Sequence, residues 1–121
     1  MNLKEIIYAS AVATFLNAAS GCAKLPDLKN PEARASWEGT YKGVIDGKRI
    51  TYKVMKEGCM AMVDFGDSLS IIVDKDCDNT ADLLNFSEDR KYLLETGKAK
   101  DVDYILKTIQ SELVNPEHKV K

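Results

Sequence analysis

Alternating apolar and polar residues over 37–73 predict a series of short antiparallel strands. In the segment 48–56 every second residue is apolar, namely Ile50, Tyr52 and Val54. Asp46-Gly47 is the dipeptide most typical of a two-residue hairpin turn, and Glu57-Gly58 marks a second turn. The segment 69–73 is rich in β-branched residues, as buried strands often are. The pattern therefore predicts a meander of about four antiparallel strands.

The apolar spacing changes to a helical period in the C-terminal part. We expect a helix over 88–95, capped by Ser87 and stopped by Gly97. A longer helix is expected over 101–114, with Asp101 as its N-cap. Its apolar stripe consists of Val102, Ile105, Leu106, Ile109 and Leu113. Both helices are expected to pack on one face of the sheet. The sequence thus predicts a single α+β domain at 37–115, followed by a charged tail at 116–121.

The first residues follow a different pattern. Lys4 precedes an uncharged and mostly apolar run over 6–19, and small residues stand directly before Cys22. This order is typical of a secretory signal. It resembles the lipobox of prokaryotic lipoproteins, in which the leader is cut before the cysteine and the sulfur is acylated. The resemblance implies a signal peptide at 1–21, a lipidated Cys22 and a lipid-anchored, extracytoplasmic place in the cell envelope.

Two further features bear on this N-terminal region. Its apolar residues also fall near helical spacing, so an ordinary N-terminal helix is the alternative to a signal peptide. The run is too short and too polar for a transmembrane anchor, which needs about 20 strongly apolar residues. Residues 23–36 contain Pro26, Pro31 and several charges without an apolar period. We therefore expect an extended tether, so that 22–36 connect the lipid to the folded domain.

Composition and charge limit the classes of partner. The chain has 121 residues and a net charge of −2, with basic and acidic residues intermixed. This length fits one small domain once a leader is removed. A protein that follows a phosphate backbone needs a clustered basic surface, and the sequence has none. Nucleic acid is therefore not an expected partner.

The three cysteines of the chain support export. An odd count is unusual in an exported protein, but acylation of Cys22 would leave Cys59 and Cys77 as one pair. An oxidising compartment would allow these two to form a disulfide, provided that the chain bends back after Val73. The alternative is two buried, reduced thiols in a cytosolic protein. Neither cysteine belongs to a CxxC pair, so redox catalysis is not expected.

An acidic segment directly after the last strand is the strongest candidate for a metal site. Asp74, Asp76, Asp78 and Asp82 occupy relative positions 1, 3, 5 and 9, and Thr80 stands where a backbone carbonyl would be used. This spacing resembles the calcium loops of EF-hands and dockerins, and the resemblance implies that these five residues hold Ca²⁺. Asn85 replaces the usual glutamate at position 12, and Asn79 replaces the glycine at position 6. The alternative is an acidic turn whose carboxylates accept backbone hydrogen bonds.

Catalysis has little support in the sequence. The only histidine, His118, lies in the predicted tail, which leaves a serine or cysteine nucleophile without a base. We therefore expect a small exported lipoprotein that acts as a binding or envelope-structural module and is not an enzyme. Its partners would be the membrane, through the lipid, and either a protein on the open sheet face or a small apolar ligand between sheet and helix.

Two other functions stay open at this point. One is a metal-dependent hydrolase that uses Asp64, Asp67 or the acidic loop, since paired carboxylates can bind a catalytic metal or activate water. The other is a cytosolic regulator that keeps its N-terminal helix. Metal-dependent turnover would favour the first, and retention of residues 1–21 would favour the second.

Overall fold

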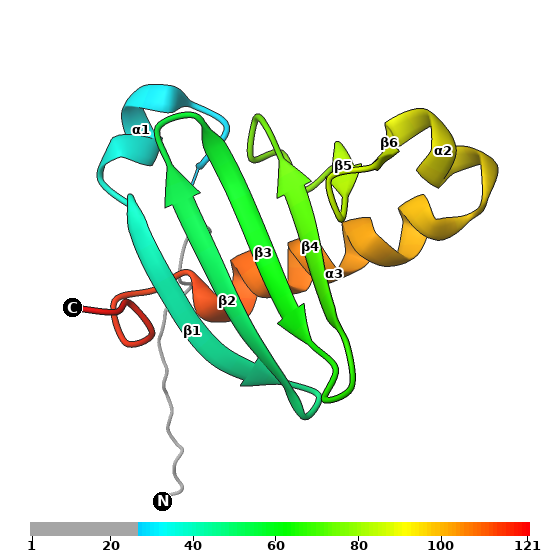
Figure 1. Cartoon of the computed structure of the whole chain (residues 1–121). Helices are drawn as coiled ribbons and strands as arrows, with labels where there is room; N and C mark the ends of the chain where they lie inside the picture. The colour runs from blue at the N-terminus through cyan, green and yellow to red at the C-terminus, as the bar shows by residue number, and fades with distance from the viewer. Residues whose placement is uncertain (1–26) are drawn as a thin grey trace, which may run out of the picture.

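A computed structural model describes residues 27–121. The predicted signal peptide at 1–21 and the predicted lipidation site Cys22 lie outside the described residues. The domain is built on one antiparallel sheet of six strands, which follow one another in chain order (Figure 1). The strands are β1 (Gly39–Ile45), β2 (Lys48–Met55), β3 (Gly58–Asp64), β4 (Leu69–Asp74), β5 (Leu83–Leu84) and β6 (Glu88–Asp89). The predicted α+β class and antiparallel meander are confirmed, but the sheet has two more strands than expected.

The tight hairpin between β1 and β2 is formed as its sequence indicates. Asp46 and Gly47 both have positive φ angles, 51° and 77°, as a type I′ turn requires. The turn pairs Ile45 with Lys48 and thereby fixes the register of the following residues. A one-residue slip would move every side chain to the other face of the sheet. In the observed register Tyr52 and its apolar neighbours on β2 face the core.

The two additional strands are short and continue the sheet beyond β4. After the acidic segment the chain returns beside β4, where Leu84 pairs with Ile72 and Leu83 pairs with Val73. β6 then pairs with β5. Each strand has only two residues. Such a short element carries no periodic pattern, and tertiary contacts with β4 determine it instead.

One long helix covers one face of the sheet. α3 (Lys98–Leu113) lies across that face in Figure 1 and buries Val102, Leu106, Ile109 and Leu113 against it. α2 (Arg90–Glu95) lies beyond the sheet edge, beside β6 and the start of α3. The expectation that both helices pack on the sheet face therefore holds for α3 alone. The apolar core fills the space between α3 and the sheet.

Both predicted helix starts differ from the structure. α2 begins after Asp89, whose Oδ1 accepts a hydrogen bond from the Tyr92 N–H at 3.0 Å, and not after Ser87. The reason is that β6 uses the residues between Ser87 and Arg90. α3 begins at Lys98, after Gly97 in the left-handed region, and not at Asp101. Gly97 permits a sharp junction between the two helices because it has no Cβ.

The structure differs from the extended tether predicted for 22–36. Leu28 is buried in the core, and α1 (Pro31–Ala35) follows it, with Asn30 as its N-cap. Arg34 is buried too, since its guanidinium donates to the carbonyls of Leu28, at 2.8 Å, and Lys56, at 3.2 Å. Residues from Leu28 onward therefore belong to the folded domain. The part of the predicted tether at 23–26 lies outside the described residues.

The C-terminal residues predicted as a charged tail lie along the outer edge of β1. The Lys42 N–H donates to the carbonyl of His118 at 3.0 Å, and the Val120 N–H donates to the carbonyl of Thr40 at 2.7 Å. These bonds satisfy backbone groups that an edge strand otherwise leaves open to other chains. Within residues 27–121 no helix combines the length and apolar character that a membrane span requires.

Candidate metal site

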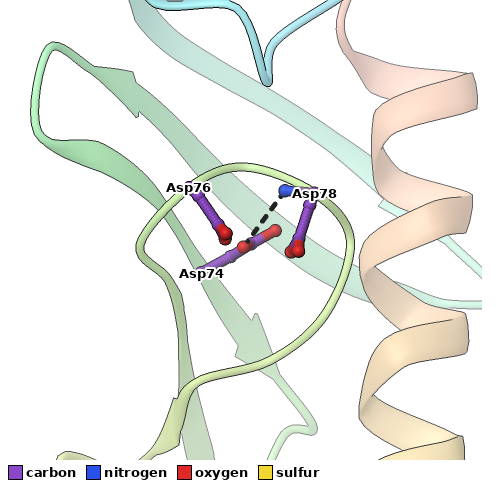
Figure 2. A group of neighbouring side chains, drawn as sticks. All are labelled: Asp74, Asp76 and Asp78. Carbon is purple, nitrogen blue, oxygen red and sulfur yellow. Dashed lines mark hydrogen bonds between the residues drawn. The ribbon is translucent and has the colours of Figure 1, made fainter.

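The acidic segment brings three carboxylates together at the end of β4. Figure 2 shows Asp74, Asp76 and Asp78 pointing toward one another inside one turn of the loop. One carboxylate oxygen of each lies within 4.8 Å of the others. We call these residues the acidic cluster. Carboxylate oxygens are the ligands that hard divalent cations prefer, so the arrangement can hold such an ion.

Asp74 organises the loop through its own hydrogen bonds. Its side chain accepts from the backbone N–H of Asp78 at 3.2 Å and from that of Asn79 at 2.8 Å (Figure 2 draws the first). These bonds bend the chain back over the end of the strand. Cys77 and Asn79 take positive φ angles of 57° and 66° in this bend. Asn79 thus occupies the left-handed position for which the loop pattern favours glycine.

The carboxyl group of Asp74 lies in an unusual electrostatic environment. It is fully buried, with 0% of its surface exposed. Burial is the main cause that raises the pKa of Asp74 to about 8, and the side chain of Asp78 raises it further. The backbone N–H groups of Asn79 and Asp78 act in the opposite direction. At neutral pH this carboxyl therefore favours its neutral, protonated form.

Asp82, a further predicted ligand, lies outside the acidic cluster. Asp82 uses Oδ2 to accept from the Lys75 N–H at 2.7 Å, which closes the base of the loop. Thr80 donates its N–H to Oδ1 of Asp78 at 3.0 Å. Asn85, at position 12, accepts from the Ile71 N–H at 2.9 Å on the sheet edge. A calcium ion takes about 6–8 oxygens, so backbone carbonyls and water would have to supply the remainder.

The predicted cysteine pair is present beside the acidic cluster. Cys59 and Cys77 are joined as a disulfide, their Cα atoms are 5.3 Å apart, and both residues are buried. Cys59 lies directly opposite Asp74 in the β3–β4 ladder. The left-handed turn at Cys77 brings its sulfur back over β3. The loop is therefore covalently attached to the strand that neighbours its first acidic residue.

Gly58 allows this loop to pass close to the start of β3. A Cβ atom at Gly58 would lie 2.5 Å from the carbonyl oxygen of Lys75, which is closer than real Cβ contacts come. The position also has a φ angle of 151°, which residues other than glycine rarely adopt. Glycine is therefore required at position 58 for two reasons: the backbone conformation there and the close approach of the loop.

Side chains of α3 and α2 hold the other end of the loop. Asn79 donates from Nδ2 to Oε1 of Gln110 at 3.2 Å. The Ala81 N–H donates to Oδ1 of Asp103 at 2.8 Å, and the same carboxylate pairs with Arg90 at 2.8 Å. The sequence did not reveal these contacts, because Gln110 and Asp103 lie outside the apolar stripe that identified the helix.

A small group of buried polar atoms lies behind the acidic cluster. Tyr52 Oη, Asn79 Oδ1 and Gln110 Nε2 have no hydrogen-bond partner among the described residues. Burial raises the pKa of the Tyr52 hydroxyl, and the nearby Gln110 amide lowers it to a smaller extent. The Tyr52 and Gln110 side chains do not form a hydrogen bond with each other. Gln110 is only 7% exposed. Its side chain lines a cleft together with Asn79 and Asp78 of the loop. Buried polar atoms without a protein partner are commonly satisfied by ordered water or an ion.

The alternative carboxylate pair is arranged differently. Asp64 forms an ion pair with Arg49 at 3.3 Å and accepts the Gly66 N–H at 2.8 Å. Asp67 lies exposed in the turn between β3 and β4. Asp64 is therefore already engaged by a basic side chain and a backbone donor, unlike the buried Asp74.

Comparison with known proteins adds no relative. No family model, no curated protein and no solved structure matches this chain. Its function is therefore argued from the residues and their geometry.

Proposed function

We propose that the protein is a small exported lipoprotein, anchored through Cys22, that serves as a binding or structural module of the cell envelope and is stabilised by calcium. The observation that carries this proposal is the pairing of Cys59 with Cys77. Structural disulfides persist in oxidising compartments and are rare in the cytosol. The pair accounts for two of the three cysteines and leaves Cys22, which follows the lipobox-like leader.

The fold supports a short connection between the lipid and the domain. Because Leu28 is buried in the core, the chain between Cys22 and Leu28 can span at most about 20 Å. A lipid on Cys22 would thus hold the domain directly at the membrane surface. The module would act there, in the extracytoplasmic part of the envelope.

Calcium is the cofactor that the acidic cluster fits best. Its three ligands are carboxylates, and all of its candidate ligand atoms are oxygen. The Gln110 amide, whose Nε2 has no hydrogen-bond partner among the described residues, lines a cleft together with Asp78. The ion would stiffen the junction between β4 and α3 and take no part in a reaction.

The open face of the sheet is the proposed surface for a protein partner. The side chains opposite α3 include Thr51, Met62 and Ile71, which lie side by side across β2, β3 and β4. Val44 and Leu69 continue this face and are largely exposed. A small apolar ligand is the second candidate, because Ile45, Ile50 and Ile105 line a narrow apolar pocket between the sheet and α3. Apolar surface of either kind favours association.

Intact-mass analysis of the protein from its native cell tests the anchor and the disulfide together. The proposal predicts a chain that starts at Cys22, carries added acyl mass and lacks the two hydrogens of a thiol pair. A chain that retains residues 1–21 and has free Cys59 and Cys77 would contradict export and favour the cytosolic regulator.

Calorimetry with calcium tests the cofactor. We expect weak binding, in the range of about 10⁻⁴–10⁻³ M that extracellular calcium modules show. Asp76→Ala should abolish the heat of binding, whereas Asp67→Ala, which removes an exposed carboxylate in another turn, should leave it unchanged. Equal heats in both variants would contradict the site. Metal-dependent turnover of generic esters or glycans by the wild type would favour the hydrolase instead.

A further inference from the structure

The disulfide enters the acidic loop at its centre. Cys77 stands between Asp76 and Asp78, and its partner Cys59 pairs with Asp74 across the β3–β4 ladder. The covalent bond thus connects the middle of the cluster to the strand that flanks its first member. Asp76 and Asp78 are therefore the direct chain neighbours of Cys77, and Asp74 lies opposite Cys59.

Hydrogen bonds also hold the loop: within the cluster the Asp78 N–H donates to Asp74, and the Thr80 N–H donates to Asp78. Asn79 is held by Gln110 of α3, and Ala81 is held by Asp103. At the other end, β4 holds Asp74 in the ladder. Among the described residues the disulfide is the covalent attachment of this stretch, and it ties Cys77, which stands between Asp76 and Asp78, to β3. It also supports Cys77 in its left-handed conformation, which non-glycine residues rarely adopt without support from their surroundings.

We propose that the Cys59–Cys77 disulfide determines the calcium affinity of the acidic loop. With the bond intact, the three carboxylates are held together in advance of the ion. Without it, their mutual repulsion separates them, and the ion must then order the segment 75–78 as it binds. This inference rests on the calcium site proposed above. A second observation at the site is the buried Gln110 amide, which is unpartnered and lines the same cleft as Asp78.

Calcium binding and reduction of the disulfide must affect each other equally, because both are equilibria of the same folded protein. If the disulfide tightens calcium binding by a given factor, calcium opposes reduction of the disulfide by the same factor. In a reaction with a dithiol reagent, each protein disulfide gains two electrons and two protons and becomes two thiols, while the reagent becomes its cyclic disulfide. A tenfold effect on affinity corresponds to about 30 mV in reduction potential.

Calorimetric titration of the mature, lipidated protein with calcium chloride tests the inference. The Cys59→Ala/Cys77→Ala variant should bind calcium about tenfold more weakly than the oxidised wild type, since ordering one further residue changes a binding constant by about this factor. The matched control is Val63→Ala, which removes buried apolar volume from the far end of β3. This control should destabilise the protein and leave the calcium affinity unchanged.

The possible outcomes separate the two proposals. Equal affinities in the oxidised wild type and the cysteine-free variant would overturn the inference and leave the calcium site intact. An absence of binding heat in the oxidised wild type would overturn the calcium site itself. If the cysteine-free variant does not fold, the wild type is equilibrated with dithiothreitol at two calcium concentrations. Excess calcium should then raise the ratio of disulfide to thiol about tenfold, and an unchanged ratio would contradict the coupling.

Discussion

The β1–β4 meander and the acidic loop after it are stabilised in opposite ways. The meander buries many apolar side chains in a regular alternation, so that its stability is distributed over many contacts. The loop depends on a few specific interactions: one disulfide, two left-handed residues, a buried carboxylate and its bonds to α3. Each interaction of the second kind holds one part of the loop in place, so its loss should change the geometry of the loop as well as the stability of the protein. This difference suggests that the meander provides stability and the loop provides the site.

The largest effect is expected in the apolar core. Leu106 lies on the buried side of α3 and is 0% exposed. Leu106→Ala should lower the free energy of unfolding by about 3–5 kcal/mol, because it removes a fully buried side chain and leaves a cavity. Urea unfolding should give the same loss with and without calcium. Leu94→Ala, at a position that is 60% exposed, is the control and should change stability by less than about 0.5 kcal/mol. A loss that disappears in calcium would contradict the separation of the two regions.

A pH dependence is expected from the loop alone. The folded pKa of Asp74, about 8, lies above its unfolded value, so the protonated carboxyl stabilises the metal-free fold. This contribution is present below about pH 4 and is lost as the pH rises through about 8. Urea unfolding in a metal chelator should therefore show falling stability across this range.

Two controls make that test specific. Asp74→Asn cannot ionise and should remove the decline between acidic and alkaline pH. Excess calcium should reduce the decline in the wild type, since the ion replaces the proton on Asp74. A decline that persists in Asp74→Asn would assign it to other groups.

A moderate effect is expected where the loop meets α3. Asp103→Ala leaves the Ala81 N–H and the Arg90 guanidinium without their shared acceptor, and should cost about 1–2 kcal/mol. The measurement is urea unfolding, combined with calcium titration, in which the affinity should fall as well. Asp101→Ala, an exposed carboxylate of the same helix, should have a smaller effect on stability and none on affinity. Similar behaviour of the two variants would contradict a structural role for Asp103.

The smallest effect is expected on the open face of the sheet. Arg49 and Asp64 form an ion pair in which the arginine is largely exposed. Arg49→Ala should therefore change the free energy of unfolding by less than about 0.5 kcal/mol, since exposed ion pairs contribute little. Chemical denaturation at low salt checks this, with Thr51→Ala on the same face as a comparison. A loss of 2 kcal/mol or more, far above the usual value for such pairs, would show that this face also stabilises the fold.

The regular part of the fold was predictable because its determinants are local. Asp46-Gly47 specifies the first hairpin, and the helical spacing of Leu106 and its neighbours identifies α3. The pairing of Cys59 with Cys77 was predicted from the odd cysteine count, on the condition that the chain bends back after Val73. The hairpin and the helix were predictable because residues close in sequence determine them.

The remainder depends on contacts between distant segments. Leu28 and Arg34 are buried because the N-terminal segment docks against the Lys56 carbonyl and the core, which no periodicity indicates. β5 and β6 are too short to carry a pattern. In the acidic loop, the resemblance to calcium loops implied five ligands, but Asp82 is engaged by the Lys75 N–H and lies outside the cluster. Sequence spacing thus located the acidic cluster, and tertiary hydrogen bonds determined which carboxylates belong to it.

Amide hydrogen exchange with and without calcium tests the central claim most directly. The account predicts that calcium slows exchange in the loop, above all at the N–H groups of Asp78, Asn79 and Thr80, which donate to cluster carboxylates. Exchange in β2 and β3 should stay unchanged except where the whole protein unfolds. Loop amides that exchange at the same rate in saturating calcium and in a chelator would contradict a calcium-stabilised loop.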